Sequence, residues 1–425
     1  MALTPSAYTD PIMNERKTDR YEGRYAARTR VMRSSAMRDL MSLTARPEII
    51  SLAGGLPATD SFPQDVFDRI NRHISDTQRA LALQYGPTEG FDFLKEDIAT
   101  IMASEGTQID PAHVLITTGG QQAIDLVTKT FIDPGDIVLA EGPAYAGALT
   151  TFSTYEADVR HVAMDSDGLI IEELEAVLDT LEAEHRRAKL LYVVPNFSNP
   201  GGTTLTLERR RRLVDLAAQR ELLVVEDNPY GLLRFEGEPL PSLLTLDAGR
   251  GNVVYLGSFS KIISPGIRMG WTVSPQAIYQ KMVFGKQATD LCSSPFTQLF
   301  VHGFVSSGAW RDYVERLCGI YRSRCNAMVQ ALSEEFPDDA SWTVPQGGFF
   351  VWATVPGIHT GDMLAKAIGE NVAYVQGSAF YQDGQGVDSM RLSFSAVPEE
   401  RLVEGVRRLG GVISDQIELY RALGL

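Results

Sequence analysis

The chain has 425 residues, of which 44% are hydrophobic and 22% are charged, and its glycines and prolines follow no period. This composition is typical of a globular protein with a sizeable core, and it excludes collagen-like, fibrous and wholly disordered chains. Acidic residues number 54 against 39 lysines and arginines, which gives a net charge of −15. A surface of that charge repels phosphate backbones, so we expect no nucleic-acid partner.

The positions of the cysteines, apolar residues and histidines indicate whether the protein has disulfides, membrane spans or a metal site. The three cysteines, Cys292, Cys318 and Cys325, form no CxxC pair, which favours free thiols in a reducing compartment. The sequence contains no run of 18 apolar residues and no apolar signal region near its start, so we expect a cytoplasmic protein without a membrane partner. The six histidines do not fall at metal-ligand spacing, so we predict no metal site.

The first 75 residues divide into two predicted segments. Residues 1–33 form a basic arm with six arginines between positions 16 and 33, and this arm either docks on a second subunit or is a flexible tail. Residues 34–75 are predicted to pack on a small domain and on the active site. They start with a helix that Ser35 caps and Pro47 ends, and the turn-rich SLAGGLPATDSFP follows.

Short apolar runs alternate with helical patterns between about residues 110 and 275. Seven runs are expected to be strands: VLITTGG, IVLAEGP, ADVRHVAM, LLYVVPN, LLVVEDNPY, VVYLGSFS and MGWTVS. Their near-continuous Val, Ile and Leu content predicts an α/β fold with a mostly parallel seven-stranded sheet covered on both faces. Long helical stretches and isolated strands follow residue 310. We therefore predict a large domain over 76–309 and a small α+β domain over 310–425.

Ligands of open α/β sheets collect at the carboxyl ends of the strands, and the sharpest such segment is GSFSKIISPGIRMGW. Lys261 follows an apolar strand there, and a lysine that is costly to bury can form a Schiff base with a carbonyl. Arg268, together with Ser258 and Ser260, could clamp a phosphate. Standing alone, the segment would be interpreted as a surface loop with a solvated lysine.

A second strand end, TTGGQQAIDLV, closes with two glycines and opens a helix whose first turn contains Gln121 and Gln122. Free N–H groups at a helix N-terminus attract an anion, and glycine lets a phosphate approach the backbone. The spacing matches neither GxGxxG nor Walker A, which disfavours a dehydrogenase or an NTPase.

Four more side chains at strand ends each have a chemical and a structural interpretation. Asp227 in EDNPY could keep a pyridine nitrogen protonated or form a turn. Asn199 in PNFSNPGG could bond a phenolic oxygen or precede a proline turn. Tyr145 in EGPAYAG could stack on a planar cofactor or pack in the core. Arg391 in SMRLSFS, opposite Met390 on its strand, could grip a carboxylate or form a structural ion pair.

A lysine, an acid, a phosphate cradle and a carboxylate clamp are together the groups that pyridoxal phosphate requires. The ordered motifs GGQQA, PAY, PNFSNPGG, EDNPY, SFSKIISPGIRMG and MRLSFS resemble the class I/II aminotransferases of fold type I over roughly residues 35–425. SLAGGLP and LQYGPTEG are similar to the branch with 2-aminoadipate and kynurenine aminotransferases and the catalytic domain of MocR-type regulators. The resemblance implies the PLP-dependent transferase fold and pyridoxal 5′-phosphate as cofactor.

The resemblance also implies roles around the cofactor. Lys261 would form the Schiff base and later move the proton of the substrate Cα, and Asp227 would pair with the pyridinium nitrogen. Asn199 and Tyr230 would bond the phenolic oxygen, and Tyr145 would stack on the ring. The phosphate would be held by Gly120, Gln121, Ser258, Ser260 and Arg268. The motif GGQ stands where many relatives have a serine before the glutamine, and NPGG replaces the commoner NPTG.

For the substrate, the resemblance implies that Arg391 binds the α-carboxylate, helped by Asn199 and a backbone group of Gly54 or Gly55. Tyr85 would reach across to the cofactor of the partner subunit, which implies a homodimer. The aromatic residues Tyr85, Phe350 and Phe380 favour an apolar or aromatic pocket wall. Arg38, by contrast, could meet a distal carboxylate or lie on a solvated helix face.

We therefore predict an aminotransferase that moves an amino group from an L-amino acid, aromatic or aminoadipate-like, to a 2-oxo acid such as 2-oxoglutarate. Two alternatives stay open at the level of sequence. The same groups support a PLP-dependent lyase or a decarboxylating deaminase of a biosynthetic pathway, because the outcome depends on which Cα bond is broken. A non-catalytic ligand-sensing module is the other, and the acidic net charge and the short arm count against it.

Overall fold

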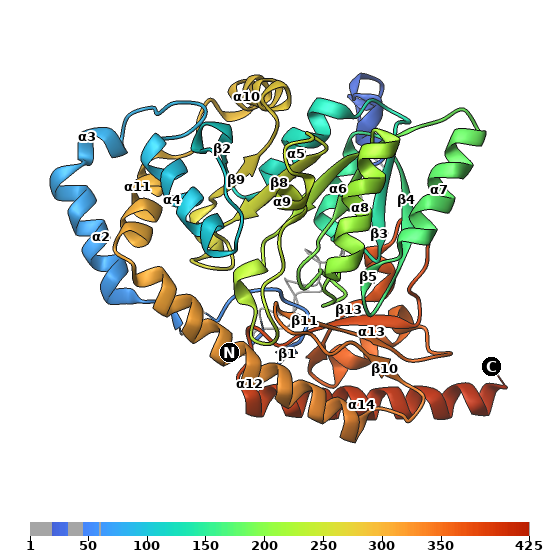
Figure 1. Cartoon of the computed structure of the whole chain (residues 1–425). Coiled ribbons are helices and arrows are strands. Elements are labelled where there is room, and N and C mark those ends of the chain that lie inside the picture. Colours follow the sequence, from blue (N-terminus) through green and yellow to red (C-terminus); the bar gives the residue numbers. More distant parts are fainter. Residues whose placement is uncertain (1–18, 33–45, 59–60, 425) are drawn as a thin grey trace.

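The computed structural model describes residues 19–32, 46–58 and 61–424. Its centre is an eight-stranded sheet of order β2-β9-β8-β7-β6-β3-β4-β5 (Figure 1). The strands are β2 (Val114–Thr117), β3 (Ile137–Gly142), β4 (Asp158–Asp165), β5 (Gly168–Leu169), β6 (Ala188–Val193), β7 (Leu223–Asp227), β8 (Val253–Ser258) and β9 (Gly270–Val273). All pairs from β8 to β4 are parallel, whereas β9 runs antiparallel to both of its neighbours.

The α/β prediction is confirmed, because each of the seven apolar runs overlaps a strand of this sheet. The predicted strand number needs one correction, since β5 adds an eighth strand at the edge. Gly168 and Leu169 pair antiparallel with the end of β4 through a turn. A two-residue strand is too short to show any periodicity in the sequence.

Helices cover both faces of the sheet because alternate strand residues point to opposite sides. On β3, Val138 and Ala140 join one core cluster, whereas Ile137 and Leu139 join another. The first face is covered by α5 (Gly120–Phe131), α6 (Ala146–Thr154) and α10 (Gln276–Asp290). The second is covered by α7 (Ile171–Ala183), α8 (Leu207–Arg220) and α9 (Leu243–Asp247). Burial on both faces explains the near-continuous apolar strands.

The C-terminal part builds a smaller α+β unit beneath the large sheet (Figure 1). Its antiparallel sheet has the order β10-β11-β14-β13. Its elements are α12 (Ala309–Glu335), β10 (Ser341–Trp342), β11 (Phe350–Thr354), α13 (Thr360–Gly369), β12 (Val372–Ala373), β13 (Val375–Gln376), β14 (Ser389–Ser393) and α14 (Glu399–Leu423).

The segment that precedes the large sheet crosses this smaller unit. Strand β1 (Ile50–Ser51) pairs with β12, and the Leu52 carbonyl accepts a hydrogen bond of 2.7 Å from the Ser393 amide. Four helices then pack beside the sheet: α2 (Gln64–Thr77), α3 (Arg79–Ala82), α4 (Asp92–Ser104) and α11 (Pro295–Ser306). The expected helix that starts near Ser35 lies outside the described residues, as does Arg38.

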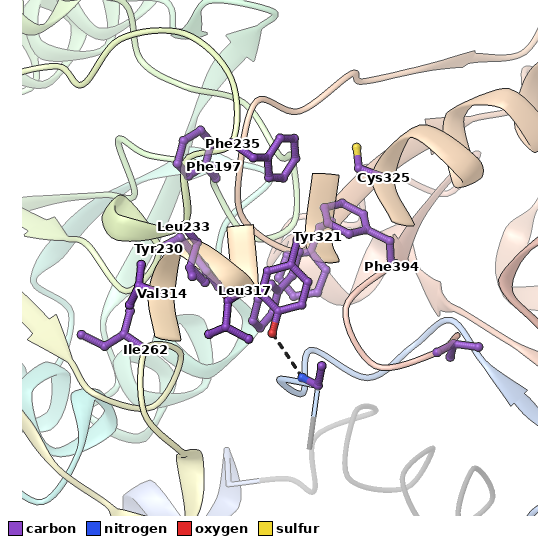
Figure 2. Close-up of a cluster of buried hydrophobic side chains, with 14 of the residues drawn as sticks. Phe197, Tyr230, Leu233, Phe235, Ile262, Val314, Leu317, Tyr321, Cys325 and Phe394 are labelled. Atoms are coloured by element: carbon purple, nitrogen blue, oxygen red, sulfur yellow. Dashed lines mark hydrogen bonds between the residues drawn. The ribbon is translucent and has the colours of Figure 1, made fainter. Parts of the chain in front are cut away.

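A buried cluster joins the two units, as Figure 2 shows. Tyr230, Leu233 and Phe235 come from the loop after β7, and they pack with Leu317 and Tyr321 of α12. The Tyr321 hydroxyl accepts a hydrogen bond of 3.2 Å from the backbone amide of Ala58. The cluster therefore fixes the small unit and the segment after β1 against the strand ends of the sheet. Within the described ranges, no helix combines the length and apolar character that a membrane span needs.

Candidate active site

A cavity of about 680 Å³ lies where the carboxyl ends of β6, β7 and β8 meet the smaller unit. Strand-end residues such as Asp227, Ser258 and Lys261 line one side, and Arg391 of β14 lines the other. The turn after β1 contributes Gly54 and its neighbours. The position agrees with the rule that open α/β sheets bind ligands beyond their carboxyl ends.

Lys261 reaches into this cavity from the turn after β8. Its Nζ donates a hydrogen bond of 2.7 Å to the Gly55 carbonyl and lies 5.4 Å from the centroid of the Phe349 ring. Burial, together with the positive charges of Arg391 and Arg268, lowers the pKa of Lys261 to about 8. A lysine with such a pKa is neutral in a useful fraction near neutral pH, as a nucleophilic amine must be.

Asp227 ends β7 and is buried, and its Oδ2 accepts a hydrogen bond of 2.5 Å from the Tyr192 hydroxyl. Burial raises the pKa of Asp227 to about 6, and the Tyr192 bond opposes that rise. A buried carboxylate is stabilised by a nearby cation, which is what a protonated ring nitrogen would supply. The sequence did not single out Tyr192, although a hydroxyl inside the apolar run LLYVV indicates a side chain that needs a buried hydrogen-bond partner.

Arg391 is 2% exposed, and its guanidinium is fixed by several groups. Nη1 donates to Asn199 Oδ1 at 2.8 Å, and Nη2 donates to the Ala53 carbonyl at 2.5 Å. The guanidinium carbon lies 4.2 Å from the Phe350 ring centroid and 5.1 Å from that of Phe380. Burial lowers the pKa of Arg391 to about 10, so the group is still a cation at neutral pH and can bind a carboxylate.

The start of α5 forms an anion cradle. Gly119 precedes the helix with a φ of +82°, and it places no side-chain cap on the first helical N–H groups. A Cβ at Gly119 would come within 2.7 Å of the Arg268 guanidinium. Ser258 and Ser260 line the cavity beside this helix start, and the Ser260 amide donates to Ser258 Oγ at 3.1 Å. Free N–H groups, two hydroxyls and one guanidinium fit a phosphate.

Other predicted site residues also line the cavity, with partners that the sequence did not show. The Gln121 amide donates to Thr151 Oγ1 at 2.7 Å, so α6 holds its side chain. The Tyr145 hydroxyl donates to Gln121 Oε1 at 3.4 Å. Tyr230 is buried, and burial raises its pKa. The other predicted lining residues are Gly54, Gly55, Gly120 and Asn199.

Three residues lie apart from the cavity. Tyr85 follows α3 and is 76% exposed, so within one subunit it faces solvent. Phe380 is fully buried and packs on the Arg391 guanidinium instead of lining the cavity. Glu226, the neighbour of Asp227, accepts hydrogen bonds from the amides of Leu243 and Leu244 at the start of α9.

The chemistry of the cavity matches that of pyridoxal 5′-phosphate. An amine on Lys261, a buried acid on Asp227 and an anion cradle at α5 border one space. These are the groups that an aldehyde, a protonated pyridine nitrogen and a phosphate need. The residues therefore fit the cofactor, with Arg391 left for a substrate carboxylate.

Comparison with known proteins agrees with this geometry. The family model for aminotransferase class I and II matches residues 47–409. Aromatic-amino-acid aminotransferase 1 of Thermococcus litoralis is 40% identical over 94% of this chain and 96% of its own length. The 2-aminoadipate transaminase of Thermus thermophilus is 39% identical over 91% of this chain and 96% of its own.

A solved structure supports the same assignment. Pyrococcus horikoshii kynurenine aminotransferase, crystallised with PMP, superposes with a TM-score of 0.90 at 39% identity, over 94% of this chain and 98% of that one. The match spans both units and the cavity between them. The chain belongs to the class I and II aminotransferase family, whose members are pyridoxal-phosphate-dependent enzymes of fold type I.

Proposed function

We propose that this aminotransferase takes its amino group from an aromatic or aminoadipate-like L-amino acid and passes it to a 2-oxo acid such as 2-oxoglutarate. The observation that carries the proposal is the position of Lys261 Nζ, which lies in one cavity with the α5 cradle and Arg391. The names of the relatives support both donor classes. The rings of Phe350, Tyr145 and Tyr230 in the cavity wall support an aromatic side chain.

When pyridoxal phosphate is bound, it supplies an electron sink that stabilises negative charge at the substrate Cα. Arg391 binds the α-carboxylate and fixes which substituents of Cα point toward Lys261. The Lys261 amine would accept the proton of the substrate Cα and would return a proton to C4′ of the cofactor, on the other side of the C–N bond. Asp227 holds the proton on the ring nitrogen, so that the sink stays strong.

We also propose a cytoplasmic homodimer in which Tyr85 completes the partner's site. Tyr85 is 76% exposed and Leu83 is 77% exposed, and both lie just after α3. Two neighbouring side chains of this size that face solvent are typical of a surface that another subunit covers.

The proposal is tested by changing Lys261→Ala. We expect loss of the visible absorption of the holoenzyme and a fall in amino transfer by a factor on the order of 100 to 10,000. Lys281→Ala is the matched control, because Lys281 is an exposed lysine on α10. Full turnover by the Lys261→Ala variant would overturn the proposal.

Product analysis after one turnover separates transamination from the other chemistries of this fold. Transamination leaves pyridoxamine phosphate on the enzyme and releases the 2-oxo acid of the donor. A lyase releases its product while the enzyme keeps the aldehyde form of the cofactor, and a decarboxylating deaminase is recognised by the CO2 that it releases from the donor.

A further inference from the structure

The cavity contains one cation that the proposed function leaves without a role. Its charged lining residues, among those that the structure describes, are Asp227, Lys261, Arg268, Arg391 and Arg401. Lys261 takes the cofactor aldehyde, Arg268 faces the phosphate cradle, Arg391 takes the α-carboxylate and Asp227 takes the ring nitrogen. Once those partners are present, the charge of Arg401 has no counter-ion among the described residues that line the cavity.

Arg401 lies in the first turn of α14, which follows β14 after a short turn. That turn brings Val397 and Pro398 into the cavity wall, so Arg401 is reached through an apolar stretch that starts near Arg391. Its Nη2 donates a hydrogen bond of 3.0 Å to the Pro47 carbonyl, and its side chain is exposed. A neutral carbonyl orients the guanidinium and leaves its charge uncompensated.

Nearby acids do not neutralise this group. Glu399 and Glu400 share the first turn of α14 and are exposed, yet neither forms an ion pair with Arg401 in the described structure. By contrast, Arg407 and Arg408 on the same helix both pair with Glu404. Arg401 is thus a cation facing a cavity with most of its hydrogen-bonding capacity unused.

We propose that Arg401 binds the distal carboxylate of dicarboxylic substrates and is a specificity-determining residue of this enzyme. Two guanidinium groups, Arg391 and Arg401, then hold the two ends of a dicarboxylic amino acid or 2-oxo acid. An aromatic substrate uses Arg391 and the apolar wall, and it makes no charged contact with Arg401. The inference rests on the proposed transamination and adds the residue that selects one substrate class.

The test compares two half-reactions in Arg401→Gln. We expect kcat/KM for L-glutamate and 2-oxoglutarate to fall about 10- to 100-fold, because the variant loses one charge-assisted hydrogen-bond pair. The value for L-phenylalanine should change by less than a factor of about 3, because that side chain carries no charge. Arg401→Lys should recover part of the dicarboxylate activity, since it keeps the charge without the planar fork.

Binding without turnover supplies the second readout. Glutarate and 3-phenylpropionate are titrated against the holoenzyme by calorimetry, and only glutarate should lose affinity in Arg401→Gln. Arg421→Gln is the matched control, because Arg421 is an exposed arginine near the other end of α14. It should leave both ligands unchanged.

Each other outcome overturns the role of Arg401. Equal losses for both substrate classes would mean that the contact with Pro47 only holds the segment before β1. Unchanged glutarate binding in Arg401→Gln would show that Arg401 does not bind the distal carboxylate. A wild-type enzyme that is inactive toward every dicarboxylic acid would show the same. Wild-type turnover of phenylalanine tests the proposed function separately, because it does not depend on Arg401.

Discussion

At the scale of single residues, burial shifts the pKa values of two titratable groups in opposite directions. Burial lowers the pKa of Lys261 to about 8 and raises that of Asp227 to about 6. Both shifts favour the neutral form, because a charged group is poorly stabilised away from solvent. For Lys261 the neutral form is the reactive one, whereas Asp227 gains its charge when a cation arrives.

The pKa of Lys261 sets how fast the enzyme without cofactor captures pyridoxal phosphate. Only the neutral amine attacks the aldehyde, so the capture rate should rise with pH through about 8 and then level off. Stopped-flow absorbance between about pH 6 and pH 10 measures this rate. A rate that keeps rising through the ordinary range of a solvated lysine, near 10.4, would contradict the buried setting.

The sequence pointed to the residues that we propose as reactive more clearly than to the side chains that hold them in place. Lys261, Asp227 and Arg391 stand out because a charged side chain at the end of an apolar strand needs a reason. Tyr192 did not, because the strand pattern does not say which residue of LLYVV ends beside Asp227. Arg401 was missed because the turn that brings the start of α14 to the cavity has no signature in the sequence.

At the scale of elements, the phosphate cradle depends on close contact between α5 and β9. A Cβ on Gly270 would lie 2.8 Å from the Gly257 carbonyl and 2.9 Å from the Gly119 and Gly120 backbone. These neighbours are backbone atoms that cannot turn aside. A side chain at position 270 would therefore push the start of α5 away from the sheet.

Gly270→Ala should destabilise the protein on the order of 1–3 kcal/mol and weaken cofactor binding, since overpacking displaces the cradle. Gly319→Ala is the control, at an exposed position of α12 where a new Cβ meets nothing within 4 Å. It should stabilise the protein by about 0.5–1 kcal/mol, because alanine restricts the unfolded chain and favours a helix. Denaturant unfolding and fluorescence titration with pyridoxal phosphate measure the two effects. Normal cofactor affinity in Gly270→Ala would show that the contact does not shape the cradle.

The elements themselves were largely predictable. Strands buried on both faces read as continuous apolar runs, so the seven strands and the α/β class followed from the sequence. The edge strand β5 did not, because two residues carry no period. The order of strands, with β9 inserted antiparallel between β2 and β8, depends on pairing between distant segments that local patterns do not encode.

At the scale of the whole molecule, the two units and the segment after β1 close around one cavity. Arg391 and Phe350 come from the smaller unit, whereas Lys261 and Asp227 come from the large sheet. The cluster around Tyr230 and Tyr321 holds the units in that relation (Figure 2). Tyr85 lies outside this cavity, so its proposed role depends on whether two subunits assemble into a dimer.

A mixed-subunit experiment tests whether Tyr85 acts across a dimer. Tyr85→Ala and Lys261→Ala are each expected to lower activity, and subunits of the two variants are then exchanged. If Tyr85 serves the partner's site, each hybrid dimer contains one site with both intact residues, and activity returns. If Tyr85 acts within its own subunit, mixing restores nothing. Light scattering on the wild type should give the mass of a dimer.

Every role proposed for the cavity depends on Lys261 as the residue that carries the cofactor. Reduction of the holoenzyme with borohydride makes the Schiff base permanent, and mass spectrometry of its peptides then locates the phosphopyridoxyl group. We expect this group on the peptide that contains Lys261, with occupancy close to one per subunit. A label on Lys286, Lys281 or any other lysine, or no label at all, would contradict it.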